Sequence, residues 1–252
     1  MSTMKKISIR RTTLLMGRYM ALNFKHYAVL FGAMSGVLVG ISLLKTWSNG
    51  GTYDTYSFLG MGQLFIFLMG LIITSTIFKE LGTKSRGWFY MMLPANPMEK
   101  LLANWLISTV VYSVVASVVL VLTSMVNSLF TSLIFNEYFY IVNPFRMEFL
   151  KLLLHYCIIQ SIFFLGAIYF EKNNFFKTLL AIVVSSMGLM IITGIVVKLI
   201  FQSPEITIDP MEQNGTPEFL KSFVLAVKIG YYSLIVPFFL TVSYFRLKER
   251  EV

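Results

Sequence analysis

The chain has 252 residues, of which 56% are hydrophobic and only 13% are charged. Average soluble domains carry about 25% charged residues, so this composition excludes an ordinary soluble domain and indicates an integral membrane protein. The formal net charge of +9 does not favour nucleic-acid binding, because the basic residues lie beside the apolar runs, where topology signals occur. The single cysteine, Cys157, lies inside an apolar run, which excludes an intrachain disulfide and supports no cysteine-based metal site.

The first 25 residues contain six lysines and arginines and no acid. On a helical wheel most apolar residues of this arm fall on one broad side and Arg10, Arg11 and Arg18 on the other, with Leu14 as the exception. This pattern predicts an interfacial helix on the cytoplasmic leaflet, and a basic tail without structure is the alternative. The apolar run that follows is too long for a signal-peptide core and no cleavage site follows it, so we expect an uncleaved anchor.

The first predicted span, 26–44, contains Gly32, Gly36 and Gly40 at four-residue spacing. Such a stripe lets another helix approach closely, either from the same chain or from a second subunit. A short polar loop, 45–56, separates this span from the second predicted span, 57–78, which contains no charged residue.

A basic loop follows the second span and reaches residue 100. Its segment 85–93 has enough apolar bulk for a short surface helix, which Pro94 would end because its ring cannot continue the hydrogen-bond ladder. Asn96 and Glu99 have the spacing of a capping box, with a proline at the first helical position between them. The loop therefore predicts a surface helix, a stop and a capped new span; an ordinary basic loop that only fixes topology is the alternative.

The third predicted span, 98–125, is followed by apolar sequence as far as Phe135, which is too long for one simple crossing of about 30 Å. We therefore expect residues 126–150 to form an amphipathic segment on the outer face, in part re-entrant. A separate short helix is expected before the last span, and Pro237 is expected to kink that span. The remaining predicted spans are 152–170, 178–197 and 229–245.

The distribution of charge predicts that both termini lie on the cytoplasmic side. Of the 21 lysines and arginines, fifteen fall in the N-terminal arm, the 79–100 loop, the 171–177 turn and the C-terminal tail. The positive-inside rule places these segments in the cytoplasm. The sequence thus predicts a single all-α domain with six transmembrane helices.

Motifs for chemistry are scarce. The sequence contains no phosphate-binding loop and no His-Glu-x-x-His, and neither His26 nor His155 has a carboxylate or cysteine at a ligand spacing. The interiors of the predicted spans lack ionisable residues, which weighs against an ion-coupled transporter or an intramembrane hydrolase. Gln63 and Gln160 are the most polar residues well inside the spans; they either bond across helices or line a substrate path.

The run Leu-Pro-Ala-Asn-Pro-Met-Glu-Lys, 93–100, with its lead-in from Phe78 resembles the loop of the permease subunit of an ABC transporter of the type-2 exporter kind. Its Leu-Pro-Ala-x-Pro-x-Glu-Lys form is most similar to that of permeases from Bacteroidetes-type bacteria. The resemblance implies an N-terminal interfacial helix, six spans and a cytoplasmic coupling helix between spans two and three. The chain departs from that pattern in a long 126–150 segment and a short 202–228 segment.

The resemblance also implies a function. The chain would be a non-enzymatic exporter subunit in the bacterial inner membrane, paired with a second permease chain, itself or a sister, and with two ABC ATPase subunits that hold ATP and Mg. The implied ATPase-coupling residues are Glu80, Lys84, Arg86, Trp88, Phe89 and Met92. A membrane scaffold or sensor that recruits a cytoplasmic partner is the alternative, and a small membrane enzyme is a third.

Overall fold

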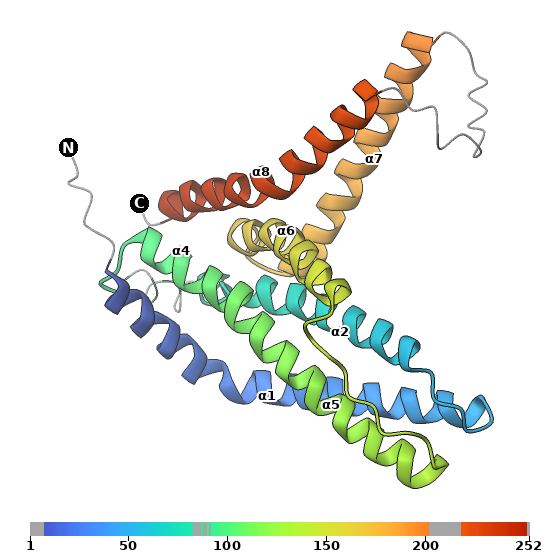
Figure 1. Ribbon diagram of the computed structural model, residues 1–252. Coiled ribbons are helices and arrows are strands. Elements are labelled where there is room, and N and C mark those ends of the chain that lie inside the picture. Colours follow the sequence, from blue (N-terminus) through green and yellow to red (C-terminus); the bar gives the residue numbers. More distant parts are fainter. Residues whose placement is uncertain (1–7, 83–86, 88–89, 91, 202–217, 251–252) are drawn as a thin grey trace.

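The computed structural model describes residues 8–82, 87, 90, 92–201 and 218–250, and every regular element in these ranges is helical (Figure 1). The elements are α1 (Ile9–Ser48), α2 (Thr55–Thr76), the 3-10 turn η1 (Lys79–Gly82), α4 (Pro97–Leu106), the π turn η2 (Ile107–Val111), α5 (Tyr112–Phe135), α6 (Met147–Tyr169), α7 (Asn174–Phe201) and α8 (Glu218–Arg250). The predicted all-α class is confirmed.

Five of the described helices are long and apolar enough to cross a membrane, as expected of a multi-pass membrane protein. They are Ile9–Ser48, Thr55–Leu81, Pro97–Phe135, Met147–Tyr169 and Asn174–Val196, and they contain the first five predicted spans apart from the last residue of the fourth and of the fifth. Helix α8 contains the sixth predicted span, 229–245, but is not among the five.

Helix α1 does not divide where the sequence suggested. Residues 9–25 of the predicted interfacial arm, 1–25, and the whole predicted span, 26–44, belong to one helix of 40 residues, which is about 60 Å long. No proline occurs between Ile9 and Ser48, so nothing in the backbone chemistry ends the helix at the change in hydropathy. The polar loop is shorter than predicted, because α2 begins at Thr55, where Asp54 accepts hydrogen bonds from the backbone N–H groups of Tyr56 and Ser57.

The helix built from α4, η2 and α5 is also longer than predicted. The prediction of a separate amphipathic segment over 126–150 is wrong, because residues 126–135 continue α5 and residues 147–150 begin α6. Asn136 ends α5 in the left-handed conformation, with a φ of 59°. The prediction of a short helix before the last span is wrong as well, since α8 runs from Glu218 to Arg250 without a break and contains Pro237.

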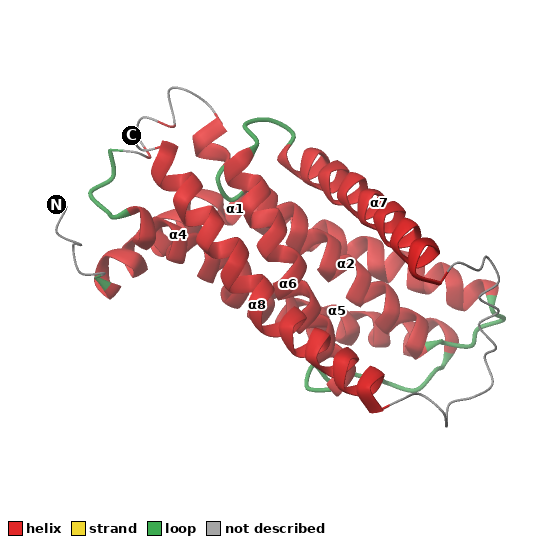
Figure 2. Cartoon of the chain, turned by 90° about the horizontal axis from the view of Figure 1, so that it is seen from above, coloured by secondary structure: helices red, strands yellow, loops and turns green. Residues whose placement is uncertain are grey.

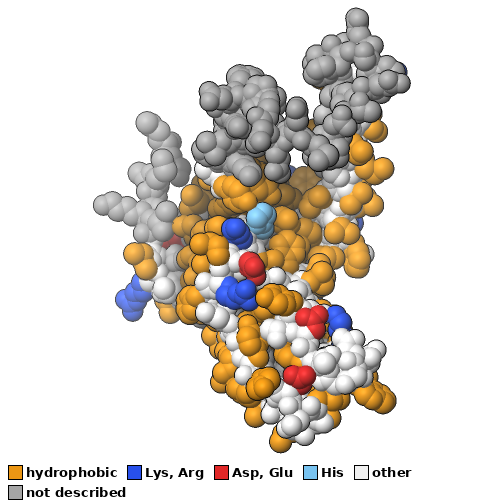
Figure 3. Space-filling model, turned by 45° about the vertical axis from the view of Figure 1, so that its right-hand side comes forward, with side chains coloured by type: hydrophobic (Ala, Val, Ile, Leu, Met, Phe, Trp, Pro, Cys, Tyr) orange, Lys and Arg blue, Asp and Glu red, His pale blue; other side chains and the backbone are white. Residues whose placement is uncertain are grey.

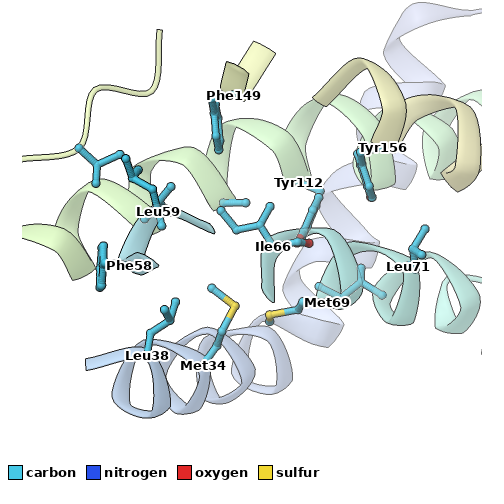
Figure 4. Packing of buried hydrophobic residues seen from close by; sticks show 14 of the residues in the cluster. Met34, Leu38, Phe58, Leu59, Ile66, Met69, Leu71, Tyr112, Phe149 and Tyr156 are labelled. Carbon is cyan, nitrogen blue, oxygen red and sulfur yellow. The ribbon is translucent and has the colours of Figure 1, made fainter. Parts of the chain in front are cut away.

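Helix α6 lies at the centre of the bundle, against α2, α7 and α8, while α1 lies against α4 and α5. The larger hydrophobic core joins α1, α2, α5 and α6, and Figure 4 shows Leu38, Ile66, Tyr112 and Tyr156 within it. Figure 2 shows α7 along one edge of the bundle, and no residue in its most apolar window is buried. Hydrophobic side chains cover most of the described face shown in Figure 3, which suits contact with lipid.

Both ends of the described chain lie at the same end of the bundle (Figure 1). Arg11, near the start of α1, lies 3.9 Å from Glu99 at the start of α4, and Arg250 lies 3.9 Å from Glu171 in the turn after α6. At the opposite end, the backbone N–H of Tyr53 donates to Glu137 at 3.4 Å. The described parts of the segments that the charge count places in the cytoplasm therefore lie at one end of the bundle.

Candidate functional site

The loop between α2 and α4 is described only in part. Lys84, Arg86, Trp88 and Phe89, and with them most of the predicted 85–93 helix, lie outside the described residues. Glu80 is half-buried in η1, and the side chain of Met92 is 67% exposed. Two of the six predicted coupling residues can therefore be placed.

The start of α4 has the predicted capping box. Asn96 is the N-cap residue, Pro97 occupies the first helical position, and the backbone N–H of Asn96 donates to Glu99 Oε2 at 3.0 Å. Such a box satisfies N–H groups that the first turn of a helix leaves without partners. It fixes the direction in which the chain leaves the loop and enters the bundle.

Glu99 does more than cap its own helix. Its side chain is completely buried, and Oε1 accepts a hydrogen bond from the backbone N–H of Ser8 at 2.8 Å. The guanidinium of Arg11 lies 3.9 Å from Oε2. Because a buried carboxylate needs hydrogen-bond donors and a countercharge, these contacts tie the start of α1 to the start of α4. Sequence reasoning identified Glu99 only as a cap.

A second ion pair joins the loop to α1. Arg18 lies 3.7 Å from Glu80, and both side chains are partly exposed. Solvent screening limits such a pair to at most about 1 kcal/mol, so its main effect is to position η1 against α1. Glu80, predicted to contact an ATPase, thus already has a partner within the chain.

A compact apolar cluster lies beneath the loop. The rings of Phe78 and Phe164 meet edge to face with centroids 5.2 Å apart, and Tyr90 packs against Phe78 at 6.5 Å. Leu101 and Leu247, both buried, bring α4 and α8 into the same cluster. The loop is therefore packed on α4, α6 and α8 at once.

A chain of buried polar groups leads from this cluster into the bundle. Asn104 donates its side-chain N–H to the hydroxyl of Tyr90 at 3.0 Å, and Ser108 donates to the carbonyl of Asn104 at 3.0 Å. Gln160 on α6 donates to Ser108 Oγ at 2.7 Å, and Thr109 donates to Gln160 Oε1 at 3.3 Å. These bonds connect the loop, α4, η2 and α6, and they satisfy the amide of Gln160 on both sides.

The π turn η2 is the one irregular helical element among these hydrogen-bonded polar groups. It contains Ser108 and Thr109, and the carbonyl of Ser108 accepts a hydrogen bond from the hydroxyl of Tyr156 at 2.7 Å. Single π turns within α-helices occur frequently at functional sites, because they present side chains and carbonyls that a regular helix would not. No sequence signal marked this turn.

The other predicted site residues are distributed over the bundle. Gln160 bonds across helices, as one of its two interpretations proposed, and Gln63 is half-buried on α2. A Cβ added at Gly32, Gly36 or Gly40 meets nothing within 4 Å, so no helix of the described chain packs closely on that stripe. Among the described residues no group of three or more histidines, cysteines and acids is placed to hold a metal ion.

Comparison of the chain with protein-family models, with curated proteins and with solved structures finds no match.

Replacement of Gln160 by leucine is expected to lower the unfolding free energy by about 1 kcal/mol, because bonds between helices within membranes have about this strength. The hydroxyl of Thr109 would lose Gln160 Oε1, its acceptor on α6, whereas Ser108 keeps its bond to Asn104. Unfolding by SDS titration in mixed micelles, followed by circular dichroism, measures the change. Gln63→Leu is the matched control, and an equal loss in both variants would show that the cross-helix bonds have no special effect.

Proposed function

We propose that the chain is the membrane-spanning permease subunit of an ATP-driven exporter in a bacterial inner membrane. In this proposal α8 provides the sixth span, both termini are cytoplasmic, and separate ATPase subunits bind ATP and Mg. The observation that carries the proposal is the attachment of the 79–100 loop to the helices around it. Glu80 and Glu99 tie it to α1, the capping box ties it to α4, and Phe78 and Tyr90 pack it on α6 and α8.

Such attachment is what mechanical coupling requires. A push on a loosely held loop would be absorbed by the loop itself. A push on this loop is passed to α1 and α4 together, because the buried carboxylate of Glu99 joins their first turns. The polar chain from Tyr90 to Gln160 extends the connection to α6. ATP-driven closure of the ATPases would thus move several spans as one body.

The ATPase contact itself is assigned to the exposed part of the loop. Met92 is exposed and available, and Lys84, Arg86, Trp88 and Phe89 are assigned to the same contact by the resemblance. Glu80 pairs with Arg18, so we assign Glu80 a structural role: it holds η1 against α1.

A second permease chain completes the proposed transporter. The glycine stripe of α1 is open within the described chain, and a small-residue stripe lets a neighbouring helix approach closely. The exposed apolar surface of α7 is available to lipid or to the same partner.

The test is the recovery of an ATPase with the chain from its native membrane. We expect a mild-detergent pull-down to contain a stoichiometric nucleotide-binding subunit and ATPase activity. Met92→Asp is expected to reduce its recovery about tenfold, equivalent to about 1.4 kcal/mol of binding. Met147→Asp is the matched control, because Met147 is 66% exposed at the start of α6, at the opposite end of the bundle.

Recovery of the chain alone, or with partners that lack ATPase activity, would contradict the permease proposal and favour a scaffold or sensor. An ATPase retained equally by both variants would keep the permease and remove Met92 from the contact. Both substitutions lie on exposed side chains, so neither removes a buried contact that the fold needs.

A further inference from the structure

A polar hollow lies between α1 and the end of α2 that faces the loop. Its volume is about 390 Å³, and its lining includes Asn23 and His26 of α1, Thr76 at the end of α2, and Lys79 and Glu80 of η1. Hydroxyl, amide, imidazole, ammonium and carboxylate groups thus face one space. The hollow can hold a polar group with several hydrogen-bond sites.

An apolar hollow lies next to it, among α1, α2, η2 and α5. Its volume is about 260 Å³, and its lining is almost entirely apolar, including Phe24, Ala28, Phe31, Ile73 and Val111. A dry cavity of about 150 Å³ lined by such side chains holds a benzene molecule, so this one has room for a larger hydrocarbon group. Ala28 is exposed, which shows that the hollow opens to the side of the bundle.

The two hollows are neighbours. Tyr27 lines both, and its hydroxyl forms a hydrogen bond of 2.7 Å with that of Tyr19, which lines the polar one. Ile73 of α2 lines the apolar hollow, and Ile77, the residue directly after α2, lines the polar one about one helical turn nearer the loop. A polar chamber therefore lies at the loop end of the bundle and an apolar one about a turn deeper.

The charge around the polar hollow favours an anion. Lys79 is exposed and lines it, while the charge of Glu80 is balanced by Arg18 at 3.7 Å. The described part of the N-terminal arm, residues 9–25, carries Arg10 and Lys25 as further exposed basic side chains and has no acid. A basic segment at a membrane surface attracts anionic lipids, at about 1 kcal/mol for each lysine or arginine near the surface.

We propose that these two hollows form a binding site for one anionic phospholipid. Its headgroup lies in the polar hollow beside Lys79, and part of one acyl chain lies in the apolar hollow beside Ala28 and Phe31. The bound lipid fills the space between α1 and the helices that carry the loop, and so stabilises their packing. The proposal does not depend on the exporter function, because it rests on the hollows alone.

The test measures how lipid changes the thermal unfolding midpoint of the purified full-length chain in neutral detergent. Phosphatidylglycerol is expected to raise the midpoint more than phosphatidylcholine does, and native mass spectrometry is expected to show one tightly held phosphatidylglycerol per chain. Ala28→Phe, which fills the apolar hollow, and Lys79→Gln, which removes the charge, are each expected to weaken phosphatidylglycerol binding about tenfold. Each variant is compared with its own lipid-free midpoint, so a change in basal stability does not enter the result.

Lys172→Gln is the matched control, because Lys172 is an exposed lysine at the same end of the bundle in the turn after α6. It is expected to bind phosphatidylglycerol as the unchanged chain does. Equal effects of the two lipids would overturn the proposed recognition of an anionic headgroup. Full binding by Ala28→Phe would overturn the assignment of the acyl chain to this hollow.

Discussion

Replacement of Glu99 by alanine is expected to lower the unfolding free energy by about 1.5–3 kcal/mol, the range for hydrogen bonds to a charged group. The backbone N–H groups of Ser8 and Asn96 would lose the carboxylate that accepts their hydrogen bonds, and Arg11 would lose its counterion. Each of these partly buried donors loses a hydrogen bond to a charged acceptor, whereas the exposed guanidinium returns to water. Unfolding in mixed micelles by SDS titration measures the loss.

The control for this prediction is Glu148→Ala. Glu148 also lies in the first turn of a helix, with Arg146 at 3.9 Å, but its side chain is 69% exposed. Its removal is expected to cost less than about 1 kcal/mol, because an exposed pair is screened by solvent. Similar losses of unfolding free energy in the two variants would mean that burial of Glu99 adds no stability. That result would contradict the proposed connection between α1 and α4. If the chain is the exporter subunit proposed above, Glu99→Ala is also expected to reduce transport more than ATP hydrolysis.

The local features of this fold were predictable because short stretches of sequence determine them. Asn96 and Glu99 have capping-box spacing around Pro97, and the box is present. Apolar runs of the length of a membrane crossing likewise predicted the five long helices. These signals need no knowledge of which segments meet in space.

Helix ends were harder to predict, because hydropathy reports where a helix meets water and not where it stops. Residues 9–25 are polar enough to suggest a separate arm, yet no proline interrupts the backbone and α1 runs on. The same reasoning ended the third span at 125, although the helix continues to Phe135. A helix is free to extend beyond the hydrocarbon layer, since its backbone hydrogen bonds are internal.

The candidate site depends on contacts between distant parts of the chain. Ser8 and Glu99 are 91 positions apart, and Gln160 meets Ser108 from 52 positions away. No local pattern indicates such pairings. Glu99 and Lys100 are both buried where a surface loop would leave them exposed, and the sequence identified Glu99 only as a cap.

The second large effect is expected at Gly70, where α2 packs closely on α5 and α6. A Cβ at this position would lie 2.4 Å from Tyr156 Cε2 and 2.6 Å from Tyr112 Cε1. Neither ring can retreat freely, because both are buried and their hydroxyls bond to the carbonyls of Ser108 and Ile66. Gly70→Ala is therefore expected to lower the unfolding free energy by about 1–3 kcal/mol, the cost of overpacking a dense core.

Gly60→Ala on the same helix is expected to raise the unfolding free energy instead. Gly60 is exposed and a Cβ there meets nothing within 4 Å, so alanine gains about 0.5–1 kcal/mol from its better helix propensity. The pair separates the effect of space from the effect of backbone freedom, and SDS titration of both variants measures it. A stabilising Gly70→Ala would show that α2 and α6 can part without cost. That result would contradict the tight packing through which the loop is proposed to move the spans.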